Sequence, residues 1–91
     1  MKKRIKLKIY GLVQGVGYRY MSQKTAKIFG FTGYVRNLED GTIEILAEGE
    51  EKKLKEFIDW CYNGVGPAQV QKIEKSWSEA TSEFSDFLIK F

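Results

Sequence analysis

A segment of nine residues, 11–19, combines three glycines with a terminal arginine and could bind an anion. Glycine adopts positive φ angles without steric strain, so the segment can bend sharply between two regular elements. Successive backbone N–H groups in such a bend can point inward and bind a negatively charged group. The guanidinium of Arg19 suits phosphate because its planar fork donates two parallel hydrogen bonds. The segment therefore predicts a phosphate-binding loop that includes the Arg19 side chain.

The expected start of a helix at this segment supports the same prediction. Apolar residues recur with a helical period from Tyr18 onward, so Arg19 is expected in the first helical turn. The free N–H groups and the positive end of the helix dipole at that turn favour an anion. A cation at this position is electrostatically unfavourable unless an anion lies beside it. The alternative interpretation is an ordinary glycine-rich turn followed by a surface arginine.

A second candidate residue, Asn37, is expected to lie at the same edge of the sheet. A helix joins the strand that ends near Gly11 to the strand that ends near Asn37, so the two strands are expected to run parallel. Their carboxyl ends then meet at one edge, which brings Asn37 close to Arg19. A carboxamide can accept a hydrogen bond from water and donate one to a phosphate oxygen. A local role for Asn37 in the turn at Asp40 and Gly41 is the alternative.

The hydrophobic period along the chain predicts an α+β fold. Strands are expected at 4–10, 33–38, 42–48, 69–77 and 84–91, and helices at 18–29 and 51–63. This order indicates a ferredoxin-like split βαβ sandwich, an antiparallel-rich sheet of about five strands with two helices on one face. A single domain is expected over residues 1–91.

Apolar stripes predict which faces of these elements are buried. In the final strand, alternate side chains are expected to face one way, and the acidic residues of the third strand and second helix are expected to form a solvated face. Ser22 is expected to lie away from the centre of the first helical stripe. The first helix is expected to bury Tyr18, Met21, Thr25, Ile28 and Phe29, the second Leu54, Phe57, Ile58 and Cys61, and the alternate residues of the last strand are Phe87, Ile89 and Phe91.

The residue inventory excludes several classes of chemistry. The chain has no histidine, which removes the commonest general base and most zinc sites. Its one cysteine, Cys61, falls in the predicted core stripe and is expected to be structural rather than nucleophilic. The glycine bend lacks the Lys-Ser or Lys-Thr of a Walker nucleotide loop, and no paired-carboxylate or magnesium motif is apparent. A phosphatase with no metal, cofactor or catalytic base needs a substrate with a good leaving group, and acyl phosphates meet this requirement.

Two long motifs resemble the signatures of the acylphosphatase family. The stretch IYGLVQGVGYR is similar to the pattern aliphatic-x-Gly-x-Val-Gln-Gly-Val-x-Phe-Arg. The stretch GYVRNLEDGTIEILAEG resembles the second signature, with glycines at Gly33, Gly41 and Gly49. Tyr18 stands where the family usually has Phe or Met, and Ile43 stands where Val is usual. The similarity in layout covers nearly the whole chain.

The resemblance implies an enzyme that hydrolyses acyl phosphates to a carboxylate and inorganic phosphate, without a metal or a covalent intermediate. It implies that the Arg19 guanidinium binds the phosphoryl oxygens and that Asn37 orients the attacking water. The implied ligands are a small-molecule acyl phosphate and, as a product-like ligand, inorganic phosphate or sulfate. The backbone amides implied to bind phosphate are those of Gln14, Gly15, Val16, Gly17, Tyr18 and Arg19.

Charge and hydropathy bear on partners and location. Residues 1–30 carry eight basic and no acidic side chains, which could attract nucleic acid. An RNA-binding ferredoxin-like module is therefore one alternative, although the central strands offer only Tyr34 for base stacking. A non-catalytic phosphate-binding accessory domain is another, although the chain ends at Phe91 without a transferase part. Neither a signal segment nor a membrane-spanning run is apparent, so we expect a monomeric cytoplasmic protein.

Overall fold

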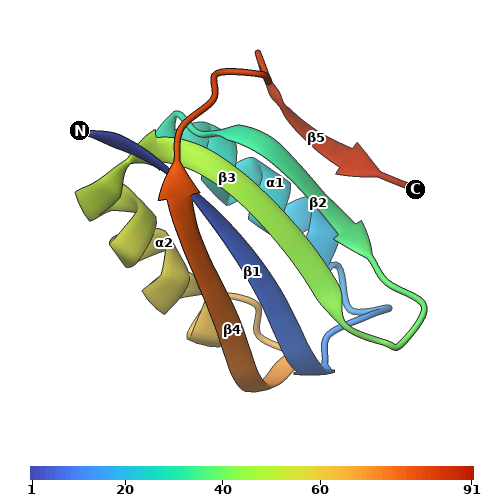
Figure 1. Ribbon diagram of the computed structural model, residues 1–91. Helices are drawn as coiled ribbons and strands as arrows, with labels where there is room; N and C mark the ends of the chain where they lie inside the picture. The colour runs from blue at the N-terminus through green and yellow to red at the C-terminus, as the bar shows by residue number, and fades with distance from the viewer.

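The computed structural model describes residues 1–91 and contains five strands and two helices (Figure 1). Both predicted helix ranges are confirmed, whereas the last strand is shorter than the predicted 84–91. No helix combines the length and the apolar character that crossing a bilayer requires. In chain order the elements are β1 (Lys2–Leu12), α1 (Tyr18–Phe29), β2 (Thr32–Asn37), β3 (Ile43–Glu50), α2 (Glu51–Asn63), β4 (Gln69–Glu79) and β5 (Phe87–Lys90).

The five strands form one sheet in the order β4-β1-β3-β2-β5. Neighbouring strands are antiparallel except β2 and β5, which are parallel. Both helices cover the same face of this sheet (Figure 1). The predicted α+β ferredoxin-like sandwich is therefore confirmed. Because β1 and β2 both pair antiparallel to β3, they run in the same direction, and their carboxyl ends reach one edge of the sheet.

The core lies between the two helices and the sheet face that they cover. Alternate residues of β1, namely Ile5, Leu7 and Ile9, are fully buried there. The buried stripe predicted for α2 is also confirmed. Within that stripe, burial raises the pKa of the Cys61 thiol to about 12, so the thiol stays protonated at neutral pH. The Cys61 carbonyl accepts a hydrogen bond of 2.6 Å from the Tyr18 hydroxyl, which links α2 to the start of α1.

The buried stripe predicted for α1 was wrong at two positions. Ile28 is 78% exposed, whereas Ser22 is fully buried. The face of α1 that packs on the core carries Tyr18, Ser22 and Ala26, which lie four residues apart. Ser22 tolerates burial because its hydroxyl donates a hydrogen bond of 3.1 Å to the Arg19 carbonyl. Two of the three buried side chains of this helix, Ser22 and Ala26, are small, and a hydrophobic period does not detect the polar one.

Glu48 on β3 is buried, contrary to the solvated face predicted for the acidic residues of this strand. It is 5% exposed, and the connection between β4 and β5 covers it. Its carboxylate accepts hydrogen bonds from Arg4 Nε at 2.7 Å and from the N–H groups of Thr81 and Ser82 at 2.9 Å each. Burial alone would raise the pKa of this carboxyl, but these hydrogen bonds outweigh it and lower the pKa to about 2.

Acidification is expected to destabilise the protein through Glu48. In the unfolded chain this carboxyl has a pKa near 4.5, so its contribution to stability is complete above that value and is lost as the pH falls toward 2. Glu48→Gln should lower the free energy of unfolding by about 1–3 kcal/mol at neutral pH. It should also flatten the pH dependence. Urea denaturation of both proteins from pH 7 to pH 2 measures this, and parallel pH profiles would contradict it.

Candidate active site

The segment between β1 and α1 forms a bend whose shape depends on glycine. Gly15 has a φ of 76° and Gly17 a φ of 80°, both in the left-handed region. Gly17 is also the N-cap of α1. No atom lies within 4 Å of a Cβ built at either position. Backbone conformation, rather than lack of space, therefore accounts for glycine here.

The backbone N–H groups of this bend are not used inside the protein. Met21 is the first residue of α1 whose N–H has a backbone acceptor, the Gly17 carbonyl at 3.0 Å. No N–H group of residues 14–20 donates a hydrogen bond to another protein group. Free N–H groups at the start of a helix, together with the helix dipole, favour an anion. The bend thus presents a row of unpaired donors.

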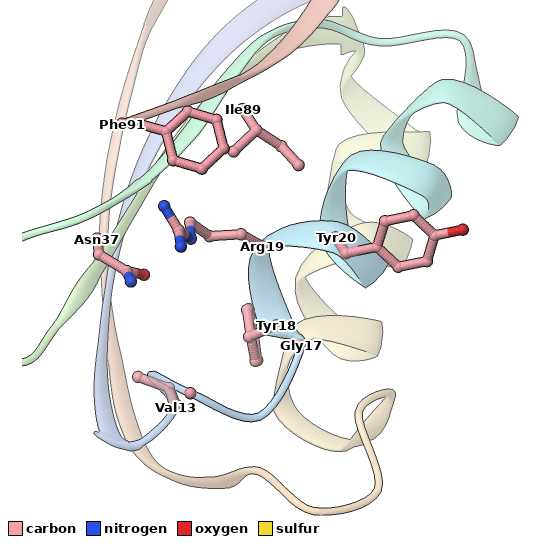
Figure 2. Close-up of a pocket in the computed structure, with 9 residues that line it drawn as sticks. Val13, Gly17, Tyr18, Arg19, Tyr20, Asn37, Ile89 and Phe91 are labelled. Carbon is pink, nitrogen blue, oxygen red and sulfur yellow. The ribbon is translucent and has the colours of Figure 1, made fainter.

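Arg19 and Asn37 line one pocket at the carboxyl ends of β1 and β2 (Figure 2). The pocket has a volume of about 250 Å³. The Arg19 guanidinium and the Asn37 carboxamide extend toward one another inside it (Figure 2). Both residues therefore lie at one edge of the sheet, as the chain order predicted. The lining consists of Val13, Gly15, Gly17, Tyr18, Arg19, Tyr20, Asn37, Ile89 and Phe91.

The Arg19 guanidinium has neither an acidic partner nor a hydrogen-bond acceptor. All nine salt bridges of the structure use other residues. Its Cζ lies 4.9 Å from the centre of the Phe91 ring, a cation–π contact that leaves the donor edge of the guanidinium free. Arg19 also has the only charged side chain of the lining. The pocket therefore combines one uncompensated positive charge with hydrogen-bond donors.

The side-chain oxygen of Asn37 is the one buried side-chain polar atom of the structure that has no hydrogen-bond partner. A buried acceptor without a partner is unfavourable by about 1–3 kcal/mol. Such an atom is typical of a site that is completed by a ligand or an ordered water. The carboxamide of Asn37 therefore offers an unused acceptor at the pocket, across from Arg19 (Figure 2).

The predicted loop residues divide into two groups in the structure. Gly15, Gly17, Tyr18 and Arg19 line the pocket, whereas Gln14 and Val16 do not. The sequence prediction gave Gln14 only a backbone role. Its side chain in fact crosses to the turn between β2 and β3, where Nε2 donates to the Leu38 and Thr42 carbonyls.

Sequence reasoning missed four residues of the pocket, Val13, Tyr20, Ile89 and Phe91. Two of these come from the end of the chain. Because β5 pairs parallel to β2, its carboxyl end reaches the same edge as Asn37. The alternation of Phe87, Ile89 and Phe91 was visible in the sequence, but the pairing of β5 with β2 was not. Tyr20 lines the rim only, since its ring points away from Arg19 (Figure 2).

Comparison with known proteins identifies the family. The sequence matches the family model for acylphosphatases over residues 5–89. An acylphosphatase from Caldanaerobacter subterraneus subsp. tengcongensis is 44% identical over 89 residues, which cover 98% of this chain and 99% of that protein. The chain belongs to the acylphosphatase family. It is therefore a hydrolase, and its substrates are acyl phosphates.

Solved structures agree with this membership. The crystal structure of an acylphosphatase from Bacillus subtilis matches with a TM-score of 0.94 at 35% identity and covers 98% of this chain and 99% of that one. The same acylphosphatase fold matches a part of full-length HypF in its phosphate- and nucleotide-bound form. That match has a TM-score of 0.87 at 28% identity and covers all of this chain but 12% of the HypF chain.

The acylphosphatase pocket offers few groups for proton transfer. Burial raises the pKa of Tyr18, and its hydroxyl is already bonded to the Cys61 carbonyl. No aspartate, glutamate or cysteine lines the pocket. The groups available in it are thus hydrogen-bond donors, one guanidinium, one carboxamide and apolar side chains.

Proposed function

We propose that this acylphosphatase hydrolyses the carboxyl–phosphate bond by in-line attack of a water molecule on phosphorus. One observation carries the proposal: two unpartnered groups, the Arg19 guanidinium and the Asn37 oxygen, share a pocket with the free N–H groups of the loop. The first group binds the phosphate and the second binds the water. One domain, residues 1–91, supplies all of these groups.

Phosphate binding falls to the loop and Arg19. The free backbone N–H groups of the loop residues that line the pocket, together with the guanidinium, donate hydrogen bonds to the phosphoryl oxygens. Arg19 is not neutralised by an acid, so its full charge acts on the bound anion. Phosphoryl transfer passes through a loose transition state in which positioning and charge stabilisation supply most of the catalysis. An anion site that positions the phosphoryl group and stabilises its charge is therefore sufficient for this part of the catalysis.

Asn37 acts on the nucleophile. Its side-chain oxygen accepts a hydrogen bond from the water, and its amide group can donate to a phosphoryl oxygen. The water oxygen bonds to phosphorus while the bond between phosphorus and the acyl oxygen breaks, and the electron pair leaves with the carboxylate. A phosphate oxygen takes the proton of the water. No covalent intermediate with the protein forms along this route.

The leaving group explains the preference for acyl phosphates. A carboxylate is the conjugate base of an acid with a pKa of about 4, so it departs without protonation. The alkoxide of a phosphate ester needs a general acid, and the pocket lining contains no acidic side chain. The same pocket should therefore hydrolyse acyl phosphates and leave alkyl phosphate esters intact.

We also propose the inhibitors, the oligomeric state and the cellular compartment of the protein. Inorganic phosphate is the product, so phosphate and the isosteric sulfate are proposed to occupy the loop as competitive inhibitors. We propose that the protein acts as a monomer on a small-molecule acyl phosphate, which the pocket binds. Cys61 is free and buried, which fits a reducing compartment such as the cytoplasm.

The uncovered sheet face does not favour RNA binding. Tyr34 on β2 is 9% exposed, and its hydroxyl donates to Glu44 at 2.8 Å. Two basic side chains on this face are paired with acids, Arg36 with Glu44 at 2.8 Å and Lys8 with Asp40 at 3.0 Å. Base stacking and phosphate contacts would have to disrupt these pairs.

The proposed function is tested by substrate comparison. The protein is incubated with acetyl phosphate, benzoyl phosphate and, as a matched alkyl ester, benzyl phosphate, each in the presence of EDTA. We expect turnover of both acyl phosphates, competitive inhibition by inorganic phosphate and no turnover of the ester. Loss of activity in EDTA, or comparable turnover of the ester, would overturn the proposed mechanism.

A further inference from the structure

The Gln14 side chain joins two parts of the site that are separate in sequence. Its Nε2 donates hydrogen bonds of 2.8 Å to the Leu38 carbonyl and 2.9 Å to the Thr42 carbonyl. Gln14 lies in the phosphate-binding loop, and its two acceptors lie on either side of the turn between β2 and β3. Figure 1 shows this loop, in blue, beside that turn, in green. No other side-chain hydrogen bond connects the loop to the turn.

The acceptors of Gln14 belong to a turn that internal hydrogen bonds hold together. The Leu38 N–H donates to the Thr42 carbonyl at 2.9 Å, and the Gly41 N–H donates to the Leu38 carbonyl at 3.2 Å. Asp40 Oδ1 accepts hydrogen bonds from the N–H and the hydroxyl of Thr42. A group that fixes the position of this turn therefore also fixes the position of Asn37, which directly precedes it.

We propose that Gln14 is a positioning residue that holds Asn37 at a fixed distance from the phosphate-binding loop. Its amide donates to one carbonyl directly after β2 and to one directly before β3, so it ties both ends of the turn to the loop. Arg19 and the loop N–H groups bind the phosphate without help from the hairpin, whereas the water held by Asn37 depends on it. This inference rests on the proposed function.

The expected consequence is a selective loss of kcat. A displacement of about 1 Å between a nucleophile and its target can cost about 100-fold in rate. Gln14→Met removes both donors, keeps a similar length and adds no charge near Arg19. We expect kcat for acetyl phosphate to fall about 10- to 100-fold, while the inhibition constant of inorganic phosphate changes less than about 2-fold.

A matched control separates positioning from general loss of a hydrogen bond. Gln23 also donates its Nε2 to a backbone carbonyl, that of Phe87, at 3.0 Å, but Phe87 pairs with Gly33 near the start of β2, at the opposite end of that strand from the turn. Gln23→Met should therefore leave kcat within about 2-fold of the wild type. Gln14→Asn, which keeps an amide but is one methylene shorter, serves as a second variant if Gln14→Met unfolds, and it should lose kcat in the same way.

A double-mutant cycle with Asn37→Ala gives the decisive readout. If Gln14 acts by positioning Asn37, Gln14→Met should change kcat less than about 2-fold once Asn37 is alanine. An equal fold-loss in both backgrounds, or a parallel weakening of phosphate inhibition, would overturn the inference. Failure of the proposed function looks different: the wild-type protein would not hydrolyse acyl phosphates, or Asn37→Ala alone would keep full activity.

Discussion

Replacing Arg19 with alanine is expected to lower kcat/KM for acetyl phosphate by about 10³-fold and to abolish inhibition by inorganic phosphate. Arg19 has the only charged side chain of the pocket and has no acidic partner, so nothing else can supply its charge to the phosphoryl group. Loss of one donor to a developing oxyanion typically reduces the rate by about 10²–10³-fold. Initial rates over a range of acetyl phosphate, with and without phosphate, measure both effects.

Two further variants define what Arg19 contributes. Arg19→Lys keeps the charge but loses the planar fork, so it should retain part of the phosphate affinity and only a small part of kcat/KM. Lys24→Ala removes a cation from an exposed position of the same helix and should leave both quantities unchanged. If Arg19→Ala kept kcat/KM within about 10-fold of the wild type, the assignment of phosphate binding to this residue would be wrong.

Replacing Asn37 with alanine is expected to lower kcat by about 10²–10³-fold and to leave phosphate inhibition nearly unchanged. The buried Asn37 oxygen has no partner within the protein, and the proposed attacking water supplies one. Without this acceptor the water is no longer oriented toward phosphorus, while the loop and Arg19 still bind the anion. Steady-state kinetics with acetyl phosphate, together with the inhibition constant of phosphate, separates the two quantities.

The variant Asn37→Asp tests the effect of charge at this position on phosphate binding. Asn37→Asp keeps an oxygen acceptor but adds a negative charge, which should repel the bound phosphate and weaken its inhibition. Asn63→Ala, at the exposed end of α2, is the control and should behave as the wild type. Near-normal turnover of acetyl phosphate by Asn37→Ala would refute the role of Asn37 as the residue that orients the water.

Much of the fold could be predicted because local patterns report local structure. The helix from Tyr18 to Phe29 begins after a left-handed glycine and ends before another, Gly30, and both were visible in the sequence. The proximity of Arg19 and Asn37 followed from the chain order, since a helix connecting two strands of one sheet makes them run in the same direction. That inference needed no knowledge of side-chain contacts.

The errors share one cause. The burial of Ser22 and Glu48 depends on what packs against them, and the partners come from distant parts of the chain. A hydrophobic period identifies a face of a helix or strand but not what covers it. Ile28 accordingly lies on the apolar stripe of α1 and is still exposed, because no other element covers that side of the helix.

The sequence by itself determined the composition of the anion site. Gly15, Gly17 and Arg19 are close along the chain, so their backbone conformation and charge follow from residue type and short-range geometry. Only the tertiary structure decided that the Gln14 amide spans the β2–β3 turn and that the Phe91 ring lies on the Arg19 guanidinium. These contacts depend on the pairing of β2 with β3 and β5, and residues so distant in sequence meet only once that pairing has formed.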